Sequence, residues 1–525
     1  MSEKLYNGII ISDQCPLQDV NLERDQPQKI PYLDNPPEVI TIDVGRQLFV
    51  DEFIIDAGLT NMARTYHKPA KYSNNPIMFP ETAEEKNPNF PPVAISKCGG
   101  VWFDDKDQLF KMWYMAGYLG HMAYAYSTDG VHWKRPQLDV VPGTNLCLPR
   151  KFHPDSGSVV IDYDTKDPSQ RYKMLLRAPD TPDHSHFPGL MMTSADGIHW
   201  SAPKKTGDMG DRSTMFYNTF RKKWVQSIRY SDSVSRRSRH YFEHDNYLKS
   251  GEWNAEDTIP WLRADCLDES GESFPELYNF DSIPYESLML GFFQILKGPP
   301  NHICDAHGMP KLTELVLGYS RDGFHYSRPD RQSFIGARRE PGSWEYGYIE
   351  SSAGMCLVVG DELWFYYSAY AGDPKRINCD WTQAGTYANG AVGLAKLRRD
   401  GFVSMSARFE SAHLHTRPVL FSGSHFFVNV NTAGSELKVV VVGPDNKSMK
   451  GFDIDDCIGY SGNSTCTEIR WKDADLASLA GQPVRFLFIM DRGEIYSFWV
   501  SQSSKGESRG FVAAGGPGYN NYKDQ

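Results

Sequence analysis

The chain has 525 residues and a net charge of -11, from 55 Lys and Arg against 66 Asp and Glu. This negative balance repels a phosphate backbone, so we expect no nucleic acid partner. No run of about 18 apolar residues occurs, so we expect no membrane partner either. Nine Cys residues without a Cys-x-x-Cys pair argue against a zinc ribbon and against a disulfide framework.

The N-terminal segment, residues 1–40, is rich in Pro and polar residues and is predicted to form an arm across the surface. Met1 to Ile11 has neither the basic start nor the continuous apolar stretch of a secretory signal. The chain as written is therefore expected in the cytoplasm. If a leader has been removed, the expected location is the periplasm or the outside of the cell.

A short phrase, Ser-x-Asp-Gly-x-His followed by Trp or Tyr, recurs along the middle of the chain. Its copies begin at Ser127, Ser194 and Ser320, so the first interval is 67 residues and the second is 126, close to twice the first. This spacing predicts a degenerate copy near Trp253, and an altered copy follows at Arg399 to Phe402. Five units of about 65 to 80 residues, rich in short strands, predict a five-bladed β-propeller over residues 41–409.

The first unit indicates how a blade is built. Residues 99–104, 110–116 and 122–127 alternate or run apolar, and turn residues separate them. The Asp-Gly pair then supplies a tight turn, because Gly tolerates a positive φ and Asp can bond its own backbone. We therefore interpret the repeated phrase as a folding device and its acids as poor catalytic candidates. The strand-like segment Arg46 to Ile55 is expected to pair with the last blade and close the ring.

The pattern changes from about Glu410. Five strand-like runs joined by Gly, Asn and Asp turns, without the repeated phrase, predict an antiparallel β-sandwich over residues 410–502. Residues 503–525 are rich in Gly, Ser and Asn and are predicted to form a flexible tail. The expected fold class is all-β, a five-bladed propeller followed by a C-terminal sandwich.

Acids recur where the innermost strand of a blade is expected to begin. Asp155, Asp211, Glu286 and Glu350 each precede an apolar run, whereas the first blade reads Lys97-Cys-Gly-Gly instead. Because the innermost strands of a propeller line one channel, these acids are expected to meet at its mouth. A glycosidase needs two carboxyl groups about 5 to 10 Å apart, one protonated and one ionised.

Several stretches resemble a known family of enzymes. They are Gly45 to Asp51, Phe110 to Tyr114, Arg171 to Met174, Tyr285 to Leu288, the repeated phrases, Thr416 to Pro418 and Gly423 to Val430. They are similar to the five-bladed propeller glycosidases of the invertase, levanase and arabinanase kind, and more closely to bacterial relatives of the invertase family. The resemblance implies a glycoside hydrolase with three acids on successive blades.

Carried over residue by residue, the resemblance implies a role for each acid. Gly210-Asp211-Arg212 is similar in position to the family's stabiliser element, and Tyr285-Glu286-Ser287 to its acid element. Glu286 is therefore expected to be the general acid, with a pKa raised by burial, and Asp211 to stabilise the charge on the sugar. The family's first-blade nucleophile motif has no counterpart, so Asp155, or Asp51 from the closing strand, takes that role.

His67, Arg212, Tyr285 and Glu350 are predicted to bind the sugar, which is expected to be part of an oligosaccharide or polysaccharide. The pairs His184/His186 and His413/His415 have the same-face spacing that zinc uses, but neither has a third ligand beside it, so no metal and no cofactor is expected. Two alternatives stay open. One is a non-catalytic glycan-binding propeller, and the other is a polysaccharide lyase with a His or Tyr base beside arginines that bind a uronate.

Overall fold

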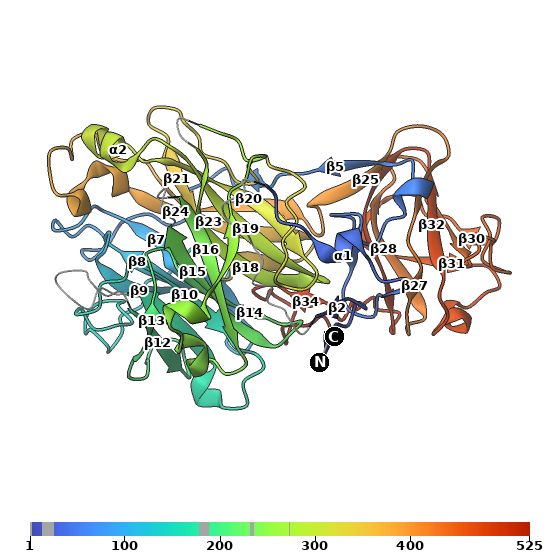
Figure 1. The fold of residues 1–525 in the computed structure, drawn as a ribbon, viewed down its shortest axis with the longest axis horizontal. Coiled ribbons are helices and arrows are strands. Elements are labelled where there is room, and N and C mark those ends of the chain that lie inside the picture. Colours follow the sequence, from blue (N-terminus) through green and yellow to red (C-terminus); the bar gives the residue numbers. More distant parts are fainter. Residues whose placement is uncertain (1–2, 13–25, 178–187, 232–235, 272–273) are drawn as a thin grey trace.

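A computed structural model describes residues 3–12, 26–177, 188–231, 236–271 and 274–525. In this part of the chain the structure is mostly β, with α-helices only at α1 (Pro31–Asp34) and α2 (Asn301–His307), which confirms the all-β class. Strands β7 to β24 form one end of the elongated molecule and β25 to β33 the other (Figure 1). Among the described residues, no helix has the length and apolar character needed to cross a membrane.

The segment from Ala94 to Arg398 folds, within the described residues, into five antiparallel sheets of strands that follow one another in the chain. The sheets are β7 (Ala94–Asp104), β8 (Leu109–Ala116) and β9 (His121–Ser127); β10 (Ser156–Ile161), β11 (Tyr172–Arg177), β12 (Pro188–Ser194) and β13 (Lys204–Asp208); β14 (Thr214–Asn218), β15 (Lys223–Ser231), β16 (Arg237–His244) and β17 (Ile259–Arg263); β18 (Glu276–Glu286), β19 (Leu288–Gly298) and β20 (Leu312–Ser320); and β21 (Gly347–Glu350), β22 (Cys356–Val359), β23 (Glu362–Tyr370) and β24 (Gly390–Arg398).

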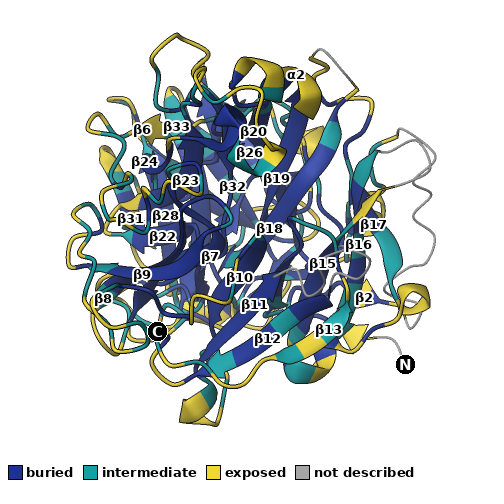
Figure 2. Ribbon diagram, turned by 90° about the vertical axis from the view of Figure 1, so that its left-hand side faces the viewer, coloured by how far each residue is buried: buried dark blue, intermediate teal, exposed yellow. Residues whose placement is uncertain are grey.

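These five sheets contact one another in chain order, and the fifth sheet contacts the first. The contact that closes the ring includes parallel bridges from Val93 to Gly390 and from Gly100 to Ala353. The strands that start each sheet are mostly buried, whereas exposed residues gather at the turns and outer strands (Figure 2). The first strands of the sheets therefore lie together at the centre of the ring.

The repeated phrase follows the third strand of its sheet, as predicted. Ser127 Oγ donates to Asp129 Oδ1, and the same oxygen of Asp129 accepts the backbone N–H of His132 at 2.8 Å. Gly130 has a φ of 75°, a backbone conformation that residues with a side chain rarely adopt. The copies at Ser194 and Ser320 repeat this hydrogen-bond pattern. The phrase is a turn, and its acids are occupied in forming it.

The segment Arg46 to Ile55 does not close the ring, contrary to the prediction. It forms β4 (Gln47–Leu48), which pairs with β33 in the C-terminal part, whereas β6 (Ala70–Lys71) pairs with β24 of the fifth sheet. Leu48 and Val50 belong to the core of the five sheets, and Phe49 between them belongs to the C-terminal core. Alternating side chains thus hold this segment between the two cores, away from the outer edge of the fifth sheet.

The C-terminal part consists of two sheets around one core. Their strands are β5 (Ala63–Tyr66), β25 (Val403–Ala407), β28 (His425–Asn431), β30 (Cys457–Ile458), β31 (Asn463–Trp471) and β33 (Gly493–Ser501) with β4 in the larger sheet, and β26 (Ala412–His415), β29 (Lys438–Val442) and β32 (Arg485–Met490) in the smaller. Strand β25 lies before residue 410, so this part begins earlier than the sequence predicts. β3 (Ile40–Thr41) pairs in parallel with β27 (Val419–Leu420), and β1 (Glu3–Lys4) pairs with β2 (Ile10–Ile11).

The last residues are also built into the fold, unlike the flexible tail that their composition predicts. Strand β34 (Phe511–Val512) pairs with the end of β18, and Val512 to Ala514 are buried. The backbone of Ala514 bonds both Phe103 and Cys356, which lie in the first and fifth sheets. Gly516 is necessary there, because a Cβ would approach the carbonyl oxygen of Val358 to 1.7 Å. The small residues of this segment allow close backbone contact.

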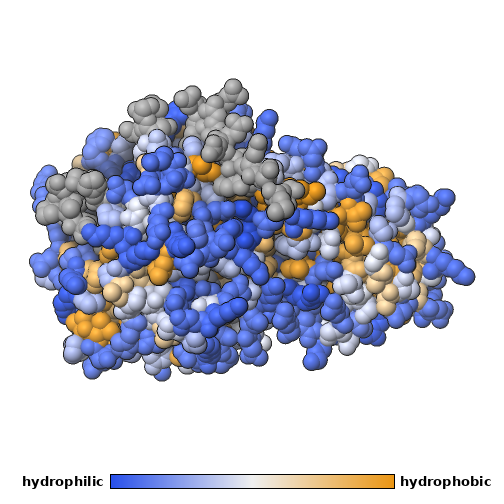
Figure 3. Space-filling model, turned by 60° about the horizontal axis from the view of Figure 1, so that its bottom comes forward, coloured by the Kyte–Doolittle hydropathy of each residue, from blue (hydrophilic) through white to orange (hydrophobic). Residues whose placement is uncertain are grey.

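The surface is largely polar on the face shown in Figure 3, with hydrophobic side chains in patches, several of them over the C-terminal part. Large exposed apolar side chains such as Trp381, Phe409 and Ile458 lie far apart in the chain and on different sheets or loops. Scattered apolar side chains of this kind are normal for a protein surface. The functional site is therefore sought in the ring of sheets.

Candidate active site

Charged side chains gather where the innermost strands begin, at what we call the mouth of the ring. Asp155 stands directly before β10 and forms an ion pair with Arg177 at the end of β11. Asp211 stands before β14 and forms an ion pair with Arg229 near the end of β15. The inner strand and its neighbour run in opposite directions, so an acid before the first strand meets a base at the end of the second. The predicted acids Asp155 and Asp211 therefore do share one end of the ring.

The third acid at the mouth is Glu276, the first residue of β18, which accepts a 2.6 Å hydrogen bond from Arg237. Asp211 is one-third exposed, at 32%. Burial opposes its ionisation, but the guanidinium groups of Arg229, Arg177 and Arg237 outweigh that effect and hold the pKa of Asp211 below its ordinary value. This carboxylate is consequently ionised at neutral pH.

Arg212 lies inside the ring and links several sheets. Its side chain is almost fully buried, at 1% exposure, and donates to the carbonyl oxygen of Lys97 in the first sheet at 3.5 Å. Its Nε lies 3.8 Å from Oε1 of Glu350 in the fifth sheet, and its own carbonyl accepts a 2.7 Å hydrogen bond from Arg239. Among the predicted sugar-binding residues, Arg212 and Glu350 are thus brought together below the mouth.

Glu350 ends β21 and has no exposed surface. Tyr370 donates a 3.0 Å hydrogen bond to Oε2, whereas Oε1 has no hydrogen-bond partner among the described residues. A buried carboxylate oxygen without a partner is costly, so such groups in native proteins call for a specific explanation. Oε1 of Glu350 therefore retains the capacity to accept a hydrogen bond from a ligand.

A cluster of tyrosines lies next to these acids. Lys311 donates to the hydroxyl of Tyr278 at 3.1 Å, and the hydroxyl of Tyr348 lies 3.1 Å from the same oxygen. Burial raises the pKa of Tyr278, but Lys311 and Arg237 more than offset it, so its pKa lies below the ordinary value. Tyr278 is therefore the tyrosine in this cluster best prepared to give up its proton.

Glu286 does not reach the mouth, and the prediction that it converges with Asp155 and Asp211 is wrong. The innermost strand of its sheet is β18, which starts at Glu276 and ends at Glu286, so the two residues lie roughly 30 Å apart. Burial raises the pKa of Glu286, as predicted, and Arg399 and Arg46 oppose that effect.

Both oxygens of Glu286 are occupied by protein groups. Arg399 donates to Oε1 at 3.0 Å, and Oε2 accepts from Ser508 at 2.7 Å and from the backbone of Arg46 at 3.1 Å. Tyr285 is buried beside it and donates to Asp400 at 2.5 Å. This network joins the ring to the C-terminal part, so Glu286 and Tyr285 serve the fold at the opposite end from the mouth.

Two other candidates also lie away from the mouth. Asp51 is buried in an ion pair with Arg321 at 2.8 Å. His67 lies 2.8 Å from the hydroxyl of Ser404, and its ring is tilted against that of Tyr496, 5.8 Å away, in the C-terminal part. The pair His413/His415 lies on β26, where the amide of Asn61 contacts His413, and the pair His184/His186 falls outside the described residues.

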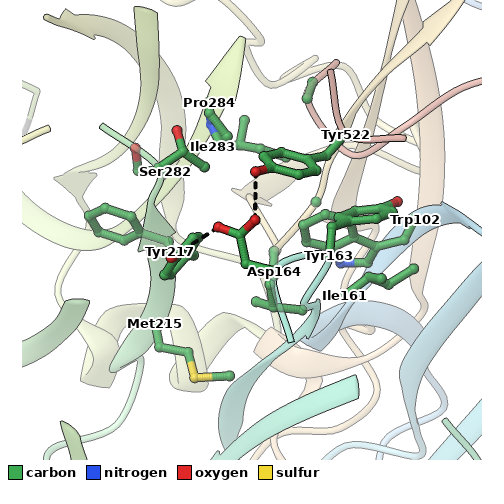
Figure 4. A pocket seen from close by; sticks show the side chains of 16 residues that line it. Trp102, Ile161, Tyr163, Asp164, Met215, Tyr217, Ser282, Ile283, Pro284 and Tyr522 are labelled. Carbon is green, nitrogen blue, oxygen red and sulfur yellow. Dashed lines mark hydrogen bonds between the residues drawn. The ribbon is translucent and has the colours of Figure 1, made fainter. Parts of the chain in front are cut away.

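The opposite end of the ring contains a separate pocket (Figure 4). Apolar side chains such as Trp102, Ile161 and Ile283 line it. Its acid, Asp164, lies between the hydroxyls of Tyr217 at 3.2 Å and Tyr522 at 2.6 Å. Tyr522 belongs to the C-terminal segment, which covers this end. The pocket is narrow and apolar, and its charge is already satisfied, so the mouth is the better candidate for chemistry on a sugar.

The arginines and tyrosines of the mouth were not singled out in the sequence as site residues. A signal existed for the arginines, because the basic cluster at Arg236, Arg237 and Arg239 is visible in the sequence. Arg237 and Arg239 lie two residues apart on β16, where Arg237 faces Glu276 and Arg239 donates to the backbone of Arg212. Tyr278 and Lys311 carry no local signal, because they are 33 residues apart in the chain and only the fold brings them together.

No protein-family model and no curated protein sequence matches the chain. Several solved structures are similar to it, and glycoside hydrolases are prominent among them. A thermostable family-43 glycoside hydrolase shares 12% identity over 60% of this chain and 94% of its own, with a TM-score of 0.40. A fructofuranosidase from Schwanniomyces occidentalis shares 12% identity over 80% of this chain and 98% of its own, with a TM-score of 0.33.

An N-acetylgalactosamine deacetylase from F. plautii is also similar, at 12% identity over 65% of this chain and 96% of its own, with a TM-score of 0.40. At these TM-scores the likeness carries no residue from one protein to the other. The function therefore has to be argued from the side chains of this chain.

Proposed function

We propose that the five sheets are the blades of a five-bladed β-propeller and that the two C-terminal sheets form a β-sandwich. The contact of the fifth sheet with the first supports a closed ring, and the shared core of the C-terminal sheets supports the sandwich. The propeller runs from about residue 68 to 402, with β6 completing its fifth blade. The sandwich then runs from about 403 to 501, with β4 and β5 added from the N-terminal side.

We infer further that the chain is a glycoside hydrolase whose active site is the mouth. Glu350 takes the role of general acid that was expected of Glu286, because its Oε1 is buried and accepts no hydrogen bond from the described residues. Asp155 acts as nucleophile or general base, and Asp211, kept ionised by its arginines, stabilises the positive charge that develops on the sugar. The oxygen of Glu350 that accepts no hydrogen bond within the described part of the chain is the observation that carries this proposal.

A polysaccharide lyase is the second candidate, and one observation favours it. A lyase removes a proton next to the carboxylate of a uronate, so it needs a base beside cations. Tyr278 has a lowered pKa and lies next to Lys311, and Arg237 stacks over its ring at 5.1 Å. The product distinguishes the two reactions, because elimination leaves an unsaturated uronate that absorbs ultraviolet light.

A panel of aryl glycosides and polysaccharides tests the hydrolase with the Glu350→Gln variant. On natural glycans we expect kcat/KM to fall by roughly a thousandfold, within the range for losing a general acid. Aryl glycosides with good leaving groups should be affected least, because they need little protonation. Glu340→Gln, an exposed carboxyl paired with Arg338, is the matched control and should keep full activity.

Three results would change the proposal. Full activity of Glu350→Gln on a natural glycan removes Glu350 from the reaction. Ultraviolet-absorbing products that disappear in Tyr278→Phe favour the lyase. Saccharide binding without turnover of any substrate in the panel favours the glycan-binding alternative.

A further inference from the structure

Lys97 is a cation without a counter-ion in the part of the chain that the structure describes. It lies in β7, where the first sheet has a lysine instead of the acid that the other sheets carry, and only 1% of its surface is exposed. Among the described residues, no hydrogen bond or ion pair reaches its Nζ. Its neighbours are the ring of Tyr118 at 4.9 Å and the ring of Tyr348 at 5.9 Å. An ammonium group has three donors, and here none is used in a hydrogen bond.

Lys311, the residue directly before β20, is a second cation beside Tyr348. Its Nζ lies 4.8 Å from the ring centre of Tyr348 and 5.4 Å from that of Tyr387. It donates to Tyr278 and to Asn301 at 2.9 Å, so two of its three donors are used. Two ammonium groups with unused donors therefore face one aromatic cluster.

The tyrosines pack against one another. Tyr118 stacks on Tyr387 at 4.2 Å with an angle of 7° between the rings, and Tyr348 stacks on Tyr370 at 4.9 Å. All four are buried, and Tyr370 also donates its hydroxyl to Glu350. Aromatic rings attract cations, so the rings of Tyr118 and Tyr348 hold the ammonium group of Lys97 close to Glu350.

An ammonium group that has no anion beside it is a ready partner for one, because hydrogen bonds between charged groups are the strong ones. We infer that Lys97 binds the acidic group of an anionic saccharide, a carboxylate or a sulfate. This inference rests on the proposed function and names its substrate class. It also explains why the first sheet lacks the acid, since a carboxylate in place of Lys97 would repel such a ligand.

Calorimetric titration of the full chain with three ligands of equal length tests the inference. The ligands are an oligogalacturonide, a sulfated galactan oligosaccharide and an unsulfated galactan oligosaccharide. We expect at least one acidic ligand to bind, and to bind at least tenfold more tightly than the neutral one. Whichever acidic ligand binds identifies the group as carboxylate or sulfate.

The Lys97→Met variant keeps the length of the side chain against the tyrosine rings and removes its charge. We expect affinity for the acidic ligand to fall by about tenfold or more, as for a hydrogen bond to a charged group. Lys97→Arg should restore part of the loss. The exposed Lys151→Met, on the loop before Asp155, is the control for a change of one charge and should bind as the native chain does.

Stability provides a readout that separates ligand binding from a purely structural role. If Lys97 has no protein counter-ion, Lys97→Met should need at least as much urea to unfold as the native chain. If its contacts with the tyrosines stabilise the fold, the variant should unfold at lower urea. Lower stability together with unchanged affinity for the acidic ligand overturns the inference.

The wild-type titrations decide the matter even if Lys97→Met does not fold. Equal binding of the neutral and acidic ligands, or binding of none of the three, overturns the inference. Hydrolysis of neutral glycans without any preference for acidic ones overturns it but leaves the proposed function standing. Tight binding of an acidic ligand without turnover supports the inference and overturns the proposed function.

Discussion

The two ends of the ring use charge in different ways. At the covered end, Glu286 is fully buried and both of its oxygens are bonded to Arg46, Arg399 and Ser508. Below the mouth, Glu350 is equally buried, but one oxygen accepts no hydrogen bond from the described residues and has only the guanidinium of Arg212 at 3.8 Å. Both are glutamates inside the same ring. They differ because Glu350 has an oxygen that accepts no hydrogen bond from the described part of the protein, whereas both oxygens of Glu286 accept one.

This difference gives a better guide to function than a shifted pKa does. Burial raises the pKa of Glu286, which is the property expected of a general acid, yet the residue fixes the ring to the C-terminal part. Two glycines confirm that role, because a Cβ on Gly45 or on Gly510 would come within about 2.5 Å of Glu286 atoms. A perturbed group is a catalytic candidate only where a substrate can reach its free atoms.

The largest effect in this comparison is expected from Glu286→Gln. The change leaves Arg46 and Arg399 without the buried carboxylate they share, and breaking such a pair costs about 3 to 5 kcal/mol. Urea unfolding measures the loss. The kcat of the folded fraction should stay as in the native chain, and a folded Glu286→Gln protein without activity would return Glu286 to the active site.

A smaller effect is expected in the turns of the repeated phrase. Asp196→Ala removes an acceptor for two backbone N–H groups at 2.8 Å and should lower the free energy of unfolding by about 1 kcal/mol. Asp322→Ala is the matched variant, because Asp322 makes the same turn but its side chain is only 5% exposed, against 46% for Asp196. Asp322→Ala should therefore lower the free energy of unfolding by more than Asp196→Ala does. Neither variant should change kcat, and loss of turnover in a stable Asp196→Ala protein would mean that the turn is part of the site.

The smallest effect concerns the mouth and appears as a shift in pH dependence. Arg229 is the strongest of the cations that lower the pKa of Asp211, so Arg229→Gln should raise that pKa toward its ordinary value. The acid limb of kcat/KM should then move to higher pH. A carboxylate with a lowered pKa also stabilises the fold above the ordinary carboxyl range and loses that contribution as the pH falls through the lowered pKa.

The pH–rate profile of Arg229→Gln checks this shift. Arg338→Gln, which removes an arginine from an exposed ion pair, is the control. An unchanged acid limb in Arg229→Gln would mean that another carboxyl controls it. Either result sharpens the contrast with Glu286, whose charge serves stability.

The sequence predicts the architecture well where the signal is local. The copies that begin at Ser127, Ser194 and Ser320 predict the position of a turn, because each phrase follows the third strand of its sheet and makes its turn there. Asp155 and Asp211 are predicted for a similar reason, since each directly precedes a short apolar strand after a polar loop. The β4 and β6 pairings escape prediction, because their partners lie more than 300 residues away in the chain.

Glu286 shows where the reasoning from local pattern fails. Strands β18 and β19 are both buried along nearly their whole length, and only Ser287 separates them. The turn has no Gly, Asn or Asp to mark it. Glu286 itself adopts a φ of 50°, a conformation more typical of Gly or Asn. The apolar run after Glu286 therefore resembles the start of an innermost strand, although it is the second strand of its sheet.

The return of the C-terminal segment to the ring has a consequence for how the molecule comes apart. After β33, the last strand of the larger C-terminal sheet, Ser508 bonds Glu286, a residue 222 positions earlier, and β34 then pairs with β18. The N-terminal side also crosses between the two parts, because β4 and β5 join the larger C-terminal sheet and β6 joins the ring. Neither part can lose its strands without releasing strands from the other. The ring of sheets and the C-terminal part are therefore expected to melt as one cooperative unit, although each has a core of its own.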